Sequence, residues 1–164
     1  MEWEYLSSAN IQSSGNIDVM GNIMSLIYGD NFIGNTTIST EYTFTFLFLD
    51  NNKLVNAKDL ILPSTSLTKQ CYLSMFNKCT SLITAPELPA TTLVIGCYSD
   101  MFHNCTSLNY IKAMFTTTPS DTYTTNWVSG VSSSGTFVKS SAATWNVTGT
   151  YGIPSGWTVE TASE

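Results

Sequence analysis

Apolar residues recur at every fourth position in two stretches of the chain, residues 67–75 and 93–101. Positions i, i+4 and i+8 lie on one face of an α-helix, so this spacing predicts two short amphipathic helices. Thr and Ser at 65–66, and two Thr at 91–92, directly precede these stretches. They are suitable helix N-caps, because a side-chain hydroxyl accepts a hydrogen bond from a backbone N–H.

The flanking parts of the chain carry weaker patterns. Residues 1–40 contain four glycines among Ile, Met and Val, which indicates short strands and turns, with Trp3 and Tyr5 sealing the first layer. Residues 41–54 begin with the alternation of a strand, but their alignment with the later stretches favours a helix. Three short strands are predicted within residues 136–159.

The two apolar stretches belong to a longer repeat. LTKQCYLSMFNKCTSL at 67–82 aligns without a gap with LVIGCYSDMFHNCTSL at 93–108, at an offset of 26 residues. A weaker match aligns 48–54 with 76–82 at an offset of 28. Repeats of about 20–29 residues are typical of leucine-rich-repeat proteins, whose units stack because one unit cannot bury its own apolar face.

These patterns predict an α/β repeat fold: a short leucine-rich-repeat solenoid of about three coils with β-rich N- and C-terminal caps. No linker interrupts the pattern, so we expect a single domain over residues 1–164. Within it, 1–40 would form the N-terminal cap, 41–115 the leucine-rich repeats, and 116–164 the C-terminal cap.

Composition narrows the classes of partner. Hydrophobic residues make up 43% of the 164 residues, enough for a core, whereas 11% are charged, against about 25% in a typical protein. All six basic residues are Lys and the net charge is −6, which disfavours nucleic acids and anionic membranes. No apolar run reaches the roughly 20 residues of a membrane span, and the start of the chain does not resemble a signal peptide.

The residues offer no evident catalytic constellation. His103 is the only histidine and takes the repeat position of Asn77, on a predicted surface turn. The acidic residues are scattered, and no nucleophile stands beside a base in the same unit. We therefore predict that the protein is not an enzyme, with no catalytic residues, no metal site and no cofactor.

The four cysteines occupy matched repeat positions: Cys71, Cys79, Cys97 and Cys105. Their spacing fits no common zinc motif. We interpret them as small buried apolar residues that stack in layers. A disulfide between stacked thiols and a metal site are the alternatives.

The pattern CYxxMFxxCTSL, followed by APELPATTL at 85–93, resembles the BspA-like leucine-rich repeats of surface proteins from gut and oral anaerobic bacteria and their phages. The resemblance implies an adhesin or recognition module that binds proteins or glycans without catalysis. It also implies an extracellular or virion-associated location, for example in a phage tail fibre. A homo-oligomer, or a part in a larger assembly, is compatible with it.

Candidate ligand-binding residues are of two kinds. Exposed aromatic rings suit sugar faces and protein hot spots, and residues that vary within a repeat suit recognition. The candidates are Tyr123, Trp127, Trp145, Tyr151, Trp157, Asn77 and His103. The first hypothesis is a recognition or adhesion module for a host or bacterial surface glycan or protein. The alternative is a structural or decoration protein of a virion or surface complex.

Overall fold

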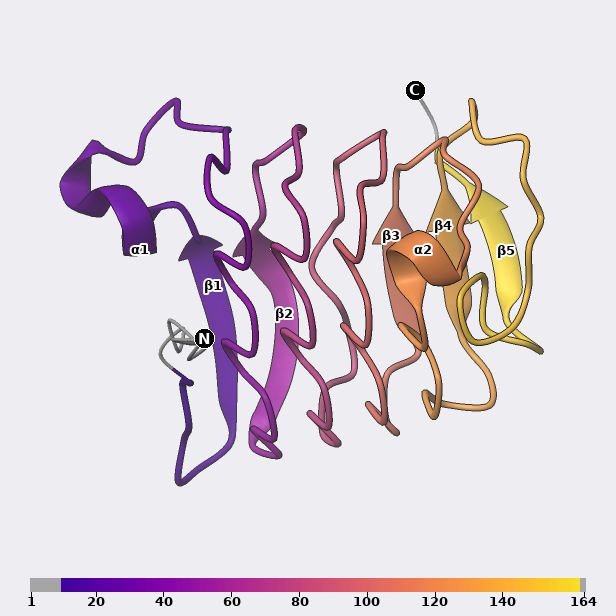
Figure 1. The fold of residues 1–164 in the computed structure, drawn as a ribbon. Coiled ribbons are helices and arrows are strands. Elements are labelled where there is room, and N and C mark those ends of the chain that lie inside the picture. Colours follow the sequence, from indigo (N-terminus) through magenta and orange to yellow (C-terminus); the bar gives the residue numbers. More distant parts are fainter. Residues whose placement is uncertain (1–9, 163–164) are drawn as a thin grey trace, which may run out of the picture.

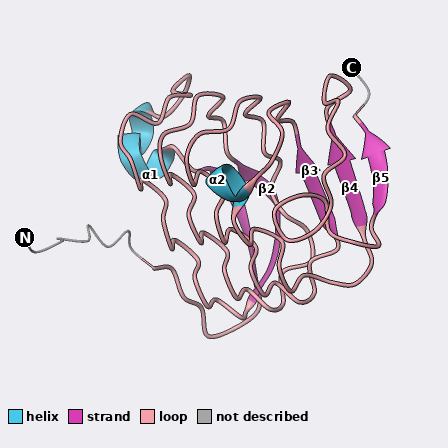
Figure 2. Ribbon diagram, turned by 45° about the vertical axis from the view of Figure 1, so that its right-hand side comes forward, coloured by secondary structure: helices cyan, strands magenta, loops and turns pink. Residues whose placement is uncertain are grey.

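The computed structural model describes residues 10–162. These residues form five short strands and three helical turns, joined by long runs of turns and loops (Figures 1 and 2). In chain order the elements are β1 (Ile17–Asn22), α1 (Ser25–Tyr28), the 3₁₀ turn η1 (Gly29–Asn31), β2 (Leu54–Ile61), β3 (Tyr110–Ala113), α2 (Asp121–Thr124), β4 (Thr136–Lys139) and β5 (Thr158–Thr161).

The predicted fold class is wrong. The described chain is mostly β and coil, with two small parallel sheets, and each of its α-helices is only four residues long. Neither 67–75 nor 93–101 is helical; both lie in loops and turns. The structure is therefore not an α/β leucine-rich-repeat solenoid. No helix in the described part of the chain is long and apolar enough to cross a membrane.

Four segments, which we name turn segments, lie at matching positions along the chain; the first three are runs of turns that stand where helices were expected, and the fourth begins with the short helix α2. They lie side by side in chain order in Figure 1. The turn segments are residues 41–50, 69–78, 95–104 and 121–130.

Two sets of backbone hydrogen bonds hold the turn segments. Alternate N–H groups donate to the next segment: Tyr72 N–H donates to the Cys97 carbonyl at 3.2 Å, and Phe76 N–H to the Met101 carbonyl at 2.9 Å. The intervening N–H groups donate within the segment, as Met75 N–H does to the Tyr72 carbonyl at 3.2 Å. Buried backbone is thus satisfied without a helix or a regular strand.

Residues with left-handed backbone explain why the four-residue spacing does not correspond to helices. Gln70, Ser74 and Lys78 have φ values of 53°, 52° and 60°, so every fourth residue of this segment is left-handed. An α-helix cannot continue through such residues. The side chains at i and i+4 nevertheless share one face, because the turn conformation itself repeats every four residues.

The strands lie on the side of the molecule opposite the turn segments. β1 pairs with β2 in parallel, and β3, β4 and β5 form a second parallel sheet in that order. Thr84 joins the two sheets through single bridges to Asn56 on β2 and Tyr110 on β3.

Side chains that match in the sequence stack in the core. Phe44, Tyr72 and Tyr98 form one ladder, with ring centroids 5.7 and 5.9 Å apart. A second ladder consists of Phe48, Phe76 and Phe102, with separations of 5.3 and 5.7 Å. Stacked aromatic pairs contribute about 0.5–1.5 kcal/mol each beyond the area they bury.

The structure at the two ends of the chain agrees only in part with the strands predicted there. Within 136–159, only β4 and the start of β5 are strands, whereas residues 144–147 form a loop. At the other end, β1 is a strand as expected from the pattern of 1–40. The predicted sealing residues Trp3 and Tyr5 lie outside the described residues.

Candidate functional site

The three candidate tryptophans are part of the core. Trp127, Trp145 and Trp157 are 0%, 5% and 7% exposed. Each indole N–H donates to a backbone carbonyl, for example from Trp127 to Gly152 at 2.8 Å and from Trp145 to Phe115 at 3.1 Å. The rings are therefore buried, and not exposed as the sequence analysis expected, and their N–H groups are already paired inside the molecule.

The two candidate tyrosines are half-buried. Tyr123 packs partly against the core cluster, and its carbonyl lies 4.0 Å from the Cys97 sulfur. The Tyr151 carbonyl accepts a hydrogen bond from the Thr124 hydroxyl at 2.8 Å. Both residues therefore help to hold the end of the molecule, and nothing in their contacts marks a ligand site.

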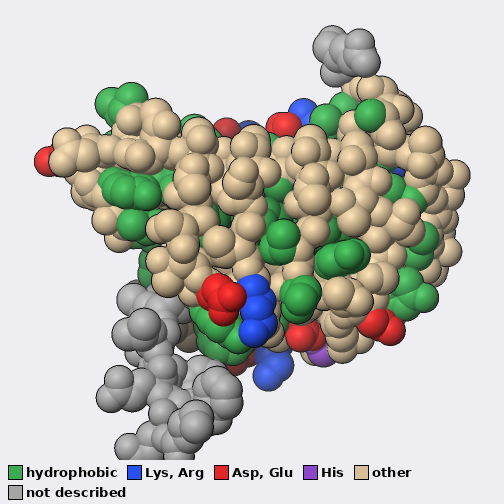
Figure 3. All heavy atoms as spheres, turned by 45° about the horizontal axis from the view of Figure 1, so that its top comes forward, with side chains coloured by type: hydrophobic (Ala, Val, Ile, Leu, Met, Phe, Trp, Pro, Cys, Tyr) green, Lys and Arg blue, Asp and Glu red, His purple; other side chains and the backbone are tan. Residues whose placement is uncertain are grey.

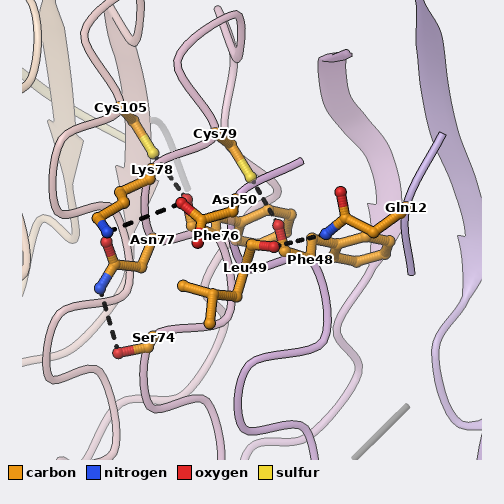
Figure 4. Close-up of polar contacts among 10 residues, drawn as sticks. All are labelled: Gln12, Phe48, Leu49, Asp50, Ser74, Phe76, Asn77, Lys78, Cys79 and Cys105. Atoms are coloured by element: carbon orange, nitrogen blue, oxygen red, sulfur yellow. Dashed lines mark hydrogen bonds and ion pairs between the residues drawn. The ribbon is translucent and has the colours of Figure 1, made fainter. Parts of the chain in front are cut away.

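Asn77 and His103 occupy the same position of neighbouring turn segments. Asn77 Nδ2 lies 3.5 Å from the Ser74 hydroxyl, and its Oδ1 is buried without a partner among the described residues (Figure 4). His103 Nδ1 lies 3.1 Å from a carboxylate oxygen of Asp100. The predicted turn position of these two residues is correct, but they are not grouped with the candidate tryptophans, which are buried.

Charged groups are sparse on the surface. Figure 3 shows one face, on which Lys, Asp and Glu side chains are few and most of the surface is neutral. Lys78 and Asp50 approach to 3.8 Å across two turn segments, and both side chains are more than half exposed. Such exposed pairs contribute little to stability, so the surface offers shape and hydrogen bonds more than charge.

The four cysteines are buried and free, as interpreted from the sequence. The thiols of Cys79 and Cys105 donate to the carbonyls of Phe48 and Phe76 at 3.0 and 2.9 Å (Figure 4). Burial raises the pKa of Cys71 to about 11 and that of Cys79 to about 12. Thiols with such pKa values stay protonated near neutral pH, which makes them poor nucleophiles and poor metal ligands.

The strongest candidate site is a row of polar side chains that crosses both sheets. Its members pair with one another strand by strand. We name this row the sheet face; it consists of Asn56, Thr84, Tyr110, Thr136 and Thr158.

Side chains of the sheet face point away from the core. Four of the five residues are half-buried and Thr158 is exposed. The residues that follow the first four, Ala57, Ala85, Ile111 and Phe137, are buried, whereas Val159 after Thr158 is 44% exposed. Adjacent residues of a strand face opposite sides. No side chain of the row makes a hydrogen bond within the described part of the chain, so these donors and acceptors are open to solvent or a ligand.

The surroundings of the row combine an apolar and a charged border. Ile83 precedes Thr84 and is 40% exposed. On the other side, Lys112 Nζ pairs with a Glu87 carboxylate oxygen at 2.9 Å. Glu87 also lines a hollow of about 290 Å³, together with Leu60 and Pro89.

No motif or bias of composition marks the sheet face in the sequence. Thr84, Tyr110 and Thr136 follow one another at intervals of 26 residues, so the repeat offset could have aligned them. Their outward direction could not be read from the sequence, because β3 and β4 are only four residues long.

No protein-family model, no curated protein and no solved structure matches the chain. The resemblance to BspA-like proteins therefore stays a prediction.

Proposed function

We propose that the protein is a non-enzymatic recognition module and that its sheet face binds a surface glycan. The observation that carries the proposal is the row of open side chains. Asn56, Thr84 and Thr136 offer an amide and hydroxyls, and Tyr110 adds an aromatic ring between the two threonines.

The dimensions of the row suit an extended ligand. Five strand positions are separated by four steps of about 4.8 Å, so the row is about 19 Å long. A polysaccharide presents hydroxyl groups along its length and apolar ring faces between them. Hydroxyls and amides can exchange hydrogen bonds with the former, and a tyrosine ring can pack against the latter.

The charge of the molecule favours a neutral ligand over a strongly anionic one. The net charge is −6, and the Lys112 ammonium beside the row is already paired with Glu87. Binding would then depend only weakly on salt, because few ion pairs would form.

We also infer that the module acts without catalysis, outside the cell or on a virion. The high thiol pKa values of Cys71 and Cys79 support a structural role for the cysteines. A phage tail fibre or a bacterial surface protein would be a suitable setting for a glycan-binding module of this size.

The test is binding of the labelled, purified protein to a panel of bacterial capsular and dietary polysaccharides. Tyr110→Ala should lower affinity at least about tenfold, because one aromatic anchor commonly contributes more than 1 kcal/mol. Tyr42→Ala is the matched control, since Tyr42 is 42% exposed on the first turn segment, away from the strands. Equal losses in both variants, or none in Tyr110→Ala, would contradict the assignment.

A structural role is the second candidate, and the apolar N-terminal end favours it. Met20, Leu26, Ile33 and Ile61 are 70%, 59%, 81% and 54% exposed. Exposed apolar patches often mark protein interfaces. A decoration protein that uses this end should self-associate or bind an assembly partner, and Ile33→Asp should abolish that association in sedimentation analysis.

A further inference from the structure

A hollow beside the sheet face combines an apolar wall with two charged side chains. It has a volume of about 290 Å³ and is lined by Lys58, Leu60, Ile61, Pro63, Glu87 and Pro89. The first four of these residues come from β2 and the turn after it, and the other two from the chain between Thr84 and β3. Sites for small ligands commonly have such an apolar lining with a few polar groups.

The apolar wall is open to a ligand. Ile61 is 54% exposed, whereas its neighbours Leu60 and Leu62 are 7% and 2% exposed. Since adjacent residues of an extended chain face opposite sides, the Ile61 side chain points outward. Pro63 and Pro89 are half-buried at the same wall. An apolar group of a ligand can therefore contact this wall without any movement of the core.

The two charged side chains supply one hydrogen-bond donor and one acceptor. Lys58 is exposed, and its ammonium forms no ion pair with residues 10–162. The Glu87 carboxylate accepts a hydrogen bond from the Lys112 ammonium through Oε2 at 2.9 Å. Its second oxygen, Oε1, receives no hydrogen bond from the described part of the chain. Both groups are thus available to a ligand in the hollow.

The hollow lies next to the Asn56 end of the sheet face. Lys58 follows Asn56 by two residues, and Glu87 follows Thr84 by three. Asn56 and Thr84 are paired by a β-bridge. A strand advances about 3.3 Å per residue, so the hollow begins about 7–10 Å from the row. A glycan that lies on the sheet face can therefore reach the hollow with one of its sugar residues.

We propose that the hollow binds the acetamido group of an N-acetylhexosamine. This inference rests on the proposed glycan binding by the sheet face and names the class of sugar. The acetamido methyl packs against Ile61 and the two prolines. The acetamido carbonyl accepts a hydrogen bond from the Lys58 ammonium, and its N–H donates to Glu87 Oε1. A hexose with a hydroxyl in this place has no methyl group for the wall and cannot reach both charged groups.

Other kinds of ligand use the hollow less completely. A carboxylate could pair with Lys58, but it would lie beside the Glu87 carboxylate in a molecule with a net charge of −6, and like charges repel. A purely apolar ligand would remove water from both charged groups without replacing their hydrogen bonds. The acetamido group is neutral and matches the wall, the donor and the acceptor together.

Matched oligosaccharides test the proposal by isothermal titration calorimetry. Short oligomers of N-acetylglucosamine and N-acetylgalactosamine would be compared with the equivalent oligomers of glucose and galactose. At least one acetylated oligomer should bind at least about tenfold more tightly than its plain counterpart. Ile61→Ser should abolish this preference. Ile95→Ser is the matched control and should keep it, since Ile95 is 59% exposed but lies on a turn segment away from the strands.

Three results would overturn the inference: equal binding of acetylated and plain oligomers, binding of neither, or a preference that persists in Ile61→Ser. Tyr110→Ala separates this inference from the proposed function. Equal binding that falls in Tyr110→Ala would refute the acetamido site and retain the sheet face. A preference that depends on Ile61 but not on Tyr110 would retain the acetamido site and contradict the sheet face. If neither kind of oligomer binds, the polysaccharide panel alone decides on the sheet face.

Discussion

Truncation of Leu82 is the sharpest test of the packing. Leu82 is 0% exposed and lies directly before Ile83, whose N–H bonds to the carbonyl of Val55 on β2. Its sequence matches, Leu54 and Leu108, are also 0% exposed. Leu82→Ala removes buried methyl groups and leaves a cavity that a stacked structure cannot easily collapse, so we expect a loss of about 2–5 kcal/mol.

Thermal and urea unfolding followed by circular dichroism would measure this loss. For a chain of this length, 1 kcal/mol corresponds to about 2–4 °C, so Tm should fall by about 4–20 °C. Ile83→Ala is the control, because Ile83 is adjacent but 40% exposed, and its loss should be about 1 kcal/mol or less. If the two variants lost equal stability, the inward direction of Leu82 would be refuted.

Three further predictions concern single side chains. Tyr72→Phe should leave the free energy of unfolding unchanged or raise it by about 1 kcal/mol in urea titrations, because the Tyr72 hydroxyl is buried and has no hydrogen-bond partner among residues 10–162; a clear loss of stability would contradict this. His103→Ala should change stability by no more than about 0.5 kcal/mol, since its side chain is about a third exposed; a loss above 2 kcal/mol would place it in the core. Burial raises the pKa of the Cys71 thiol in the folded state to about 11, so folding favours the neutral thiol. The free energy of unfolding should therefore be constant below about pH 9 and fall between pH 9 and 11. A free energy of unfolding that does not change over this range would contradict the burial of this thiol.

Much of the core could be predicted from the sequence. The offset of 26 residues aligns Tyr72 with Tyr98, and these rings are stacked in the structure. The burial of the four cysteines was also predicted correctly. Residues that are identical at aligned repeat positions occupy equivalent environments in the structure. This is true whether or not the backbone around them is helical.

The backbone itself could not be predicted in the same way. A spacing of four residues between apolar positions is shared by an α-helix and by turns that repeat every four residues. Asp50, Asn104 and Gly130 occupy the left-handed position that ends each of three turn segments, and these residue types tolerate positive φ. Lys78 takes the same position in segment 69–78. In this best-matched repeat, therefore, the residue type does not indicate a left-handed turn.

The candidate site was predicted less well than the core. Large aromatic side chains suggest binding sites from composition alone, but Trp127 and Trp145 find carbonyl partners inside the molecule. Nothing in the sequence marks Tyr110, because it lies in a short strand with no distinctive motif. Which side of a strand faces solvent depends on how neighbouring layers pair, and that pairing is a property of the tertiary structure.

Binding to intact bacterial cells tests the central claim, recognition through the sheet face, most directly. Labelled protein would be titrated onto a set of gut bacterial strains, together with a Thr84→Val/Thr136→Val double variant that removes two hydroxyls and keeps side-chain shape. The account predicts saturable binding of the unmodified protein to at least one strain and a loss of about tenfold or more in the variant. Saturable binding that is identical for the two proteins would contradict it.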